Sequence, residues 1–234
     1  MLQEDDVALF GTRMRTTMVE RDDALPGREH RPYHVPTTHA VLGTPLEGPW
    51  PEGTQRLYVA MGCFWGAERL FWGMDGVVTT AVGYMGGFTP HPTYEETCTA
   101  RTGHTETVMV AYDPEVTSAE TLLRTFWEEH DPTQTNRQGN DVGTEYRSAV
   151  YWTTPEQEQV VRATKDAFAA ELERFRLGPI ATEMRSADDA GPFYYAEDYH
   201  QQYLHKVPNG YCGLAGTGVS CPAGILPAED GATR

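Results

Sequence analysis

The chain has 234 residues, of which 39% are hydrophobic, and its formal net charge is −16. A chain of this length can build one substantial core, so we expect one domain with extensions rather than two domains. The strong negative charge disfavours nucleic acid and anionic membrane surfaces as partners. The first thirty residues are too charged for a signal peptide, and no later stretch is apolar enough to cross a bilayer, so we expect a cytoplasmic protein.

Residues 1–54 differ in composition from the rest of the chain. They contain six prolines between Pro26 and Pro51 and show no sustained helical or strand period. We expect an extended N-terminal arm that lies across a catalytic domain at residues 55–207, without chemistry of its own.

The first motif of the domain is Gly62-Cys63-Phe64-Trp65-Gly66. It stands where an apolar run at residues 57–61, interpreted as a strand, gives way to a helix-like run at residues 67–72. A cysteine at a helix start faces the positive end of the helix dipole and unpaired backbone N–H groups, which stabilise a thiolate. The flanking glycines permit a tight bend and a close approach of substrate. Cys63 is therefore a candidate nucleophile, with a buried structural cysteine as the alternative.

The later elements follow in mixed order. They are a strand at residues 77–82 ended by Gly83, Gly86 and Gly87, a strand at 106–112, a helix through 122–127 opened by a capping box from Thr117 to Glu120, a strand at 146–152, a helix capped by Thr154 that runs through residue 172, and a strand at 181–185. Tyr195, Tyr199 and Tyr203 then follow with the spacing of one helical face. The order predicts an α+β fold, a two-layer sandwich with a mixed central β-sheet flanked by helices and a ferredoxin-like core.

Cys212 and Cys221 lie in a glycine-rich stretch, which predicts a mobile C-terminal tail at residues 208–234. Such a segment suits a relay in which one thiol attacks an oxidised Cys63 and a second takes over the disulfide. The alternative is a zinc site that these two cysteines form with His200 and His205. Redox chemistry is favoured because structural zinc usually uses closely spaced cysteine pairs.

A Cys-His hydrolase is a further alternative for Cys63. His104, His130 or His200 could serve as its base, and nothing in the sequence selects one of them. Two tail cysteines would have no function in a hydrolase. Cys98 has neither flanking glycines nor a helix start beside it, and we expect it to be structural.

Four other polar residues are candidates as a group. Tyr94, Glu106, Asp141 and Tyr146 each fall in or beside a loop next to a strand end, where functional sites collect. Any one of them alone would more commonly be a solvated or core side chain.

These motifs together resemble one known family. The segments that carry the resemblance are residues 62–66, 83–87, 92–96, 103–106, 138–148 and 195–203. From about residue 55 to 221 the chain resembles peptide-methionine sulfoxide reductase A, and the segment from Asp23 to Arg28 resembles the arm of its long, three-cysteine bacterial form.

The resemblance implies a role for each candidate. Cys63 would be the nucleophile on the sulfoxide sulfur and Glu106 the acid near its oxygen, with Tyr94, Tyr146 and Asp141 around that oxygen, Phe64 and Trp65 as the wall that receives the substrate methyl, and Cys212 and Cys221 as the recycling cysteines. The chemistry is consistent, because attack on a sulfoxide places negative charge on oxygen, which a neutral carboxylic acid and phenol donors can stabilise.

The implied function is the reduction of methionine S-sulfoxide, free and in proteins, with repair of oxidatively damaged proteins as its role. The reaction would pass through a Cys63 sulfenic acid and an intramolecular disulfide relay that thioredoxin or a similar dithiol resets. We expect no cofactor and no metal, and a monomer without nucleic-acid or membrane partners.

Overall fold

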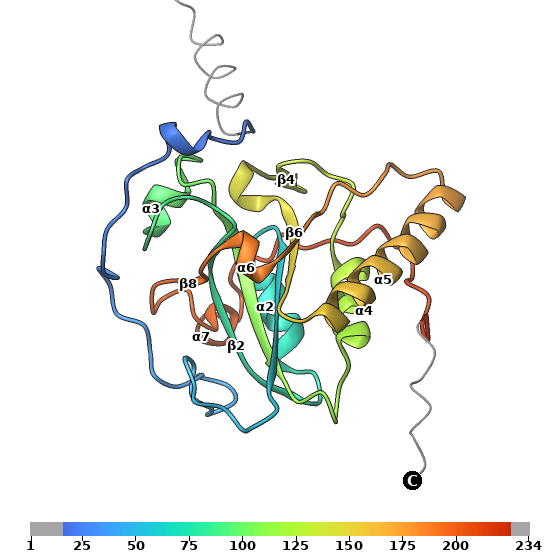
Figure 1. The fold of residues 1–234 in the computed structure, drawn as a ribbon, viewed down its shortest axis with the longest axis horizontal. Helices are drawn as coiled ribbons and strands as arrows, with labels where there is room; N and C mark the ends of the chain where they lie inside the picture. Colours follow the sequence, from blue (N-terminus) through green and yellow to red (C-terminus); the bar gives the residue numbers. More distant parts are fainter. Residues whose placement is uncertain (1–15, 226–234) are drawn as a thin grey trace, which may run out of the picture.

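The computed structural model describes residues 16–225, which fold around a six-stranded sheet in the order β7-β6-β1-β3-β2-β8 (Figure 1). The strands are β1 (Gln55–Met61), β2 (Val77–Met85), β3 (Thr105–Tyr112), β6 (Ser148–Trp152), β7 (Glu183–Ser186) and β8 (Tyr194–Tyr195). β7 pairs with β6 in parallel, and the other neighbours are antiparallel. The mixed sheet confirms the predicted α+β fold class.

The central strands bury both of their faces. Along β1, Leu57 and Val59 point to one hydrophobic cluster while Tyr58 and Ala60 point to another. This alternation follows from the two-residue period of a strand. A sheet that is apolar on both faces needs a cover on each side.

Three helices cover the first face. They are α2 (Phe64–Trp72), α4 (Ala119–Glu129) and α5 (Pro155–Arg174). Figure 1 shows α4 and α5 side by side, and their shared core contains Trp127 and Phe168, whose rings stack at 6.1 Å between centroids. α5 begins as predicted, with the Thr154 side chain accepting from the Gln157 N–H and proline at the first helical position.

The N-terminal arm covers part of the second face. Figure 1 shows it as a long extended trace around one edge of the molecule. Val35 and Leu46 are buried in the cluster of that face, and Leu46 is 0% exposed. The hydroxyl of Tyr33 donates to the carbonyl of Pro92 and lies 3.0 Å from the carbonyl oxygen of Tyr195. These contacts join the arm to the domain.

Three local predictions were wrong. The N-cap of α4 is Ser118, whose side chain accepts from the Thr121 N–H, and not Thr117. Gly83 does not end β2 but lies inside it, where it pairs with Thr107 of β3. The tyrosines at 195, 199 and 203 do not share a helical face, because Tyr195 belongs to β8 and Tyr203 begins the short helix α7 (Tyr203–Lys206).

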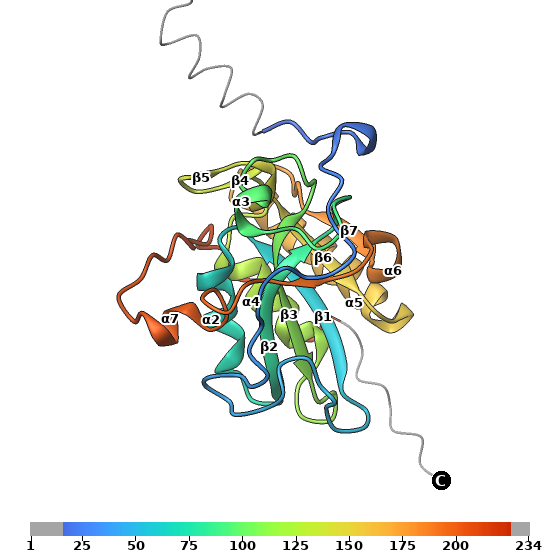
Figure 2. The ribbon, with the colours of Figure 1, turned by 90° about the vertical axis from the view of Figure 1, so that its left-hand side faces the viewer.

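The remaining elements are short and surround the ends of the strands. They are η1 (Arg21–Asp23), α3 (Tyr94–Thr97), β4 (Arg137–Gln138), β5 (Asp141–Val142), η2 (Thr144–Tyr146) and α6 (Ala187–Ala190). Figure 2 shows α2 and α7 next to each other on one side of the molecule. Between residues 16 and 225, no helix is both long and apolar enough to span a bilayer.

Candidate active site

Cys63 follows the turn between β1 and α2 and is the N-cap residue of that helix. The turn requires glycine at position 62, where φ is +89°. A Cβ on Gly62 would also lie 2.5 Å from the Cβ of Gln138. The Gln138 side chain exchanges two hydrogen bonds with the backbone of Asp131, so the β4-β5 hairpin is held directly against the turn. The predicted sequence of strand, turn and helix is confirmed.

The protonation state of Cys63 differs from the prediction. Its side chain is 8% exposed, and burial raises the pKa of its thiol well above the ordinary value. The charge of nearby Glu106 raises this pKa further, whereas the backbone N–H of Trp65 at the helix start lowers it by less. Desolvation therefore outweighs the helix terminus, and Cys63 rests as a neutral thiol rather than a thiolate.

Glu106 lies on β3, next to the start of α2. Its side chain is 2% exposed, and its Oε2 accepts a hydrogen bond from the backbone N–H of Phe64 at 2.9 Å. Burial raises the pKa of this carboxyl to about 8, against the opposing effect of the Phe64 bond. A carboxylic acid that keeps its proton at neutral pH can act as a general acid on a group bound beside Cys63.

Tyr146 is held near Glu106 by Thr105, the residue that precedes Glu106 on β3. The hydroxyl of Thr105 lies 3.0 Å from the carbonyl oxygens of both Glu145 and Arg147, which flank Tyr146. Burial, followed by the charge of Glu106, raises the pKa of Tyr146 well above its ordinary value. Its phenol is therefore a neutral hydrogen-bond donor.

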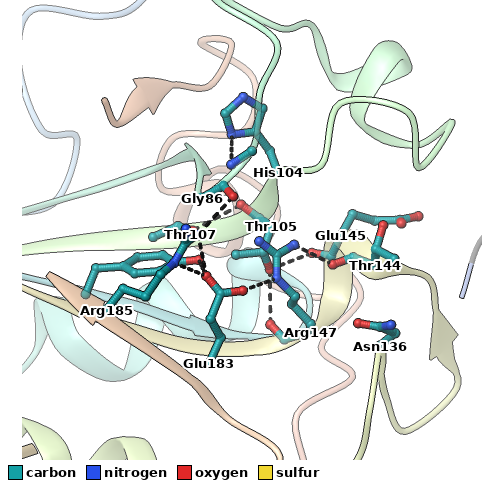
Figure 3. Close-up of polar contacts among 12 residues, drawn as sticks. Gly86, His104, Thr105, Thr107, Asn136, Thr144, Glu145, Arg147, Glu183 and Arg185 are labelled. Atoms are coloured by element: carbon teal, nitrogen blue, oxygen red, sulfur yellow. Dashed lines mark hydrogen bonds and ion pairs between the residues drawn. The ribbon is translucent and has the colours of Figure 1, made fainter. Parts of the chain in front are cut away.

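A partly buried ion-pair network supports the loop that carries Tyr146. Figure 3 shows Arg147 and Arg185 converging on Glu183. The Arg147 Nε donates to Glu183 at 2.8 Å, and its Nη1 donates to the Thr144 carbonyl at 2.9 Å. Removing Glu183 would leave the buried Arg147 guanidinium without its charge partner, which is destabilising. Sequence reasoning gave Arg147 no role, because a charge pair between distant segments leaves no local pattern.

Tyr94 is positioned through its backbone and contacts a cysteine through its hydroxyl. Its N–H donates to Glu197 at 2.8 Å, and the other carboxylate oxygen of Glu197 accepts from the Tyr84 hydroxyl at 2.8 Å. The phenol forms a hydrogen bond with Cys98, and burial is the main cause that raises the pKa of Tyr94. The sequence predicted neither the role of Glu197 nor the position of Cys98 beside this phenol.

An aromatic group lies on the other side of the helix start. The Trp65 indole Nε1 donates to His200 Nδ1 at 3.0 Å, and the Tyr203 ring stacks on the indole at 3.9 Å between centroids. The His200 ring also lies 5.1 Å from that of Phe64 and 4.5 Å from that of Tyr94. Since Nδ1 accepts and burial lowers the pKa of His200 to about 3, this imidazole is neutral. These rings form an apolar wall next to Cys63.

Asp141, on β5, faces the C-terminal tail. Each of its carboxylate oxygens lies 3.1 Å from the Tyr211 hydroxyl, and burial raises the pKa of Asp141. Its charge also raises the pKa values of Cys63 and Glu106. The structure thus brings together all five predicted reacting residues, which are Cys63, Tyr94, Glu106, Asp141 and Tyr146.

The two tail cysteines have different surroundings. Cys212 is exposed and lies over the first turn of α2, since a Cβ on Gly66 would be 2.9 Å from its Sγ. Cys221 is 3% exposed, and its backbone N–H donates to Glu128 of α4 at 2.8 Å. None of the four cysteines forms a disulfide in the structure.

Comparison with known proteins identifies the family. The sequence profile of peptide methionine sulfoxide reductase matches residues 55–219. A peptide methionine sulfoxide reductase MsrA of Brucella anthropi is 59% identical over 210 residues, which cover 90% of this chain and 94% of the relative. The chain belongs to the peptide methionine sulfoxide reductase family.

Other members of the peptide methionine sulfoxide reductase family agree. The MsrA of Rhodospirillum centenum is 60% identical over 208 residues, covering 89% of this chain and 93% of the relative. The solved structure of methionine sulfoxide reductase A of Corynebacterium diphtheriae superposes with a TM-score of 0.79 at 50% identity, covering 84% of this chain and 93% of that one. Membership makes the chain an oxidoreductase that reduces methionine sulfoxide.

The alternatives from the sequence gain no support. The ring nitrogens of His104 bond to Gly87 and Thr89, and those of His130 to Phe126 and Ser148, which are groups other than Cys63. The Nδ1 of His200, the third candidate base, accepts from the Trp65 indole, and its Nε2 lies 4.0 Å from Glu197. Throughout the part of the chain that the structure describes, no three His, Cys, Asp or Glu side chains are placed to hold a metal ion.

Proposed function

We propose that this peptide methionine sulfoxide reductase acts on the S epimer of methionine sulfoxide, free and in proteins, with Cys63 as nucleophile. The observation that carries the proposal is the buried Glu106 carboxyl, bonded to the backbone N–H of Phe64 directly after Cys63. Such an acid can protonate the sulfoxide oxygen as the Cys63 sulfur attacks the sulfoxide sulfur. The products are methionine and a Cys63 sulfenic acid.

We assign the neighbouring polar groups to the sulfoxide oxygen. Tyr94 and Tyr146 have pKa values raised first by burial, so each phenol can donate a hydrogen bond without losing its proton at neutral pH. Asp141 shares the electrostatic environment of Cys63 and Glu106. Donors already fixed in place stabilise developing negative charge without reorganisation.

Phe64 and Trp65 would receive the substrate methyl group. The wall is kept rigid by the bond from Trp65 to His200 and by the stacked Tyr203 ring. A methyl pocket and an oxygen pocket on opposite sides of a chiral sulfur accept only one hand. Burying one methionine-sized side chain contributes about 1.5–3 kcal/mol, so ground-state binding should be weak and substrate use broad.

Cys212 and Cys221 would return Cys63 to its thiol. Cys212 condenses with the sulfenic acid to a disulfide and releases water; Cys221 then attacks Cys212, which frees Cys63 as a thiol. The position of Cys212 over the first turn of α2 supports the first step. Cys221 must leave its buried place beside Glu128 before the second step. A thioredoxin-like dithiol would reduce the final disulfide, and repair of oxidised proteins in the cytoplasm would be the role.

The decisive experiment counts methionine formed by reduced protein without an external reductant. The relay predicts about two methionines per wild-type enzyme, because Cys63 is regenerated once. Cys63→Ser should give none. Cys212→Ser should give about one and hold a sulfenic acid, whereas Cys221→Ser should give about one and hold a Cys63-Cys212 disulfide.

Mass spectrometry distinguishes the last two variants, since a sulfenic acid adds an oxygen and a disulfide loses two hydrogens. Methionine formed by Cys63→Ser would overturn the assignment of the nucleophile. Two methionines from Cys212→Ser would overturn the relay. Comparable reduction of the R epimer would contradict the proposed stereochemistry.

A further inference from the structure

Glu68 is a fully buried carboxylate on α2 that the proposed chemistry does not use. It is 0% exposed, and three donors surround it. Its Oε1 accepts from the Thr80 hydroxyl at 3.0 Å and from Gln202 Nε2 at 2.7 Å, and its Oε2 accepts from the Gln202 backbone N–H at 2.8 Å. Burying a carboxylate costs free energy unless it is hydrogen-bonded, and these three bonds offset that cost.

The neighbours of Gln202 in the chain indicate what these hydrogen bonds hold in place. His200, two residues earlier, accepts the Trp65 indole N–H, and Tyr203, the next residue, stacks on that indole. Gln202 itself adopts the left-handed conformation, with φ of 47° and ψ of 42°, although it is not a glycine. A residue in this conformation persists only where its surroundings hold it there.

We propose that Glu68 is a positioning residue, which fixes Gln202 in its left-handed conformation and thereby holds His200 and Tyr203 against Trp65. Both ends of this connection lie on α2, because Trp65 and Glu68 are three residues apart and face the same segment. The helix that carries Cys63 thus also sets the geometry of its own methyl-binding wall. This role rests on the proposed assignment of Trp65 to the substrate methyl.

The same network reaches the N-terminal arm. The Gln202 Oε1 accepts from the Ala40 N–H at 3.1 Å. His39 Nδ1 accepts from the N–H groups of Val41 and Leu42, so its proton lies on Nε2, which donates to the Thr80 hydroxyl at 2.9 Å. The Thr80 hydroxyl therefore accepts from His39 and donates to Glu68. The arm supports the same carboxylate through two routes.

Burial raises the pKa of Glu68 to about 7, and the bonds from Gln202 and Thr80 oppose this rise, so the donor set favours the ionised, acceptor-only form at position 68. All three partners of Glu68 donate, and glutamine has nearly the same shape but carries an NH₂ group that would face one of these donors. Glu68→Gln should therefore lose at least one buried hydrogen bond without creating a cavity. The wall around Trp65 should loosen while Cys63 and Glu106 stay in place.

The test separates binding from chemistry. In Glu68→Gln we expect the KM for methionine S-sulfoxide to rise about 5-fold to 50-fold, with the single-turnover rate constant at saturating substrate within about 3-fold of wild type. The double variant Glu68→Gln/Gln202→Glu restores the hydrogen bond between the two side chains but leaves the Thr80 hydroxyl facing an amide NH₂ group. It should reverse part of the rise in KM, which a general loss of stability would not.

A second readout does not depend on turnover. The fluorescence of Trp65 is obtained by difference from Trp65→Phe in each background. Acrylamide should quench it more strongly in Glu68→Gln, because the indole becomes more accessible. This readout holds even where the proposed function fails, so the two failures are distinguishable. Thr164→Val is the matched control. Thr164, on α5 and away from the site, is the buried acceptor of the Trp127 indole N–H from α4.

Unchanged KM and unchanged Trp65 quenching in folded Glu68→Gln would overturn the proposal. Equal effects in Thr164→Val would overturn it as well, because they would assign the change to stability alone. If Glu68→Gln does not fold, Thr80→Val removes one donor with little change of shape, and the same two readouts decide.

Discussion

At the scale of single residues, burial raises the pKa values of two neighbouring groups, the Glu106 carboxyl and the Cys63 thiol. Glu106 is 2% exposed, and its pKa is raised to about 8 by burial. Cys63 next to it is also protonated at rest. In the proposed reaction, Glu106 would give its proton to the sulfoxide oxygen, and the Cys63 sulfur would become nucleophilic when its own proton leaves.

Replacing the acid tests this division. Glu106→Gln keeps an oxygen that can accept from the Phe64 N–H but removes the transferable proton. We expect the single-turnover rate constant to fall about 10²-fold to 10⁴-fold, the usual contribution of a general acid. Rapid-quench measurement of methionine checks this, with the exposed Glu95→Gln as control. A loss below 10-fold would remove Glu106 from the role of acid.

The same variant has a predicted effect on stability. The pKa of Glu106 is about 8 in the folded chain and near 4.5 in an unfolded one. Between these values the folded state holds a proton that the unfolded state has lost, so wild-type stability falls as pH rises through this window. Glutamine has no such dependence. The melting temperature of Glu106→Gln relative to wild type should therefore be higher at pH 8 than at pH 5, as thermal unfolding would show.

The residues that the sequence predicted and those that it missed differ in kind. Cys63 and Glu106 lie in short motifs, at a helix start and at a strand entrance, where local pattern carries information. Glu68 and Glu197 act through partners more than one hundred residues away. The sequence suggests His200 only as a possible base or zinc ligand, and its bond to Trp65 also spans more than one hundred residues. No local spacing indicates such contacts.

At the scale of elements, the first turn of α2 and the tail share a contact at Gly66. A Cβ there would lie 2.9 Å from the Cys212 Sγ and 3.0 Å from the Leu214 Cδ1. The close neighbours are tail side chains and not the core of the domain. A methyl group at this position should therefore move the tail rather than the helix.

Gly66→Ala should separate the two halves of the cycle. The helix gains about 0.5–1 kcal/mol from the loss of a glycine, and the first methionine should still form. Formation of the Cys63-Cys212 disulfide should slow about 10-fold or more, because misplacement of a reacting group by a fraction of its diameter is costly. Thiol titration after one turnover measures this step.

Gly73→Ala is the matched control for that variant, since a Cβ at Gly73 meets nothing within 4 Å. It should leave both steps unchanged. An unaltered disulfide rate in Gly66→Ala would show that the described position of the tail is not the one that reacts.

The errors in predicting elements have local physical reasons. Ser118 rather than Thr117 caps α4, because either hydroxyl could serve and the sequence does not distinguish adjacent candidates. A glycine stands inside β2 at position 83 because Tyr194 and Phe193 approach it so closely that a Cβ would collide with them. The tyrosines near residue 200 show helical spacing, but hydrogen bonds from Gln201 to Val82 and from Gln202 to Glu68 hold this segment as turns.

At the scale of the molecule, the arm is part of the core. Leu46 is 0% exposed on the sheet face opposite α2, and the arm reaches Gln202 through the Ala40 N–H. The proline-rich composition predicts an extended segment. It gave no measure of how much of that segment is buried, because burial depends on the surface it meets.

Leu46→Ala measures this contribution. We expect the free energy of unfolding to fall by about 2–5 kcal/mol, the usual cost of truncating a buried leucine. Val41→Ala, at a side chain that is 40% exposed, should change it by less than about 0.5 kcal/mol. Urea denaturation distinguishes the two. Equal, small effects would mean that the arm contributes little to the folded domain.

The resting state of Cys63 has a consequence for competition among oxidants. Peroxides react with cysteine according to its thiolate character and its exposure. Burial raises the pKa of Cys63 and leaves the residue 8% exposed, so we expect it to react slowly with hydrogen peroxide. With Cys63 as the proposed nucleophile, the enzyme would stay reduced in the same oxidising surroundings that generate its substrate, and its thiol would react with damaged methionine rather than with the agent that caused the damage.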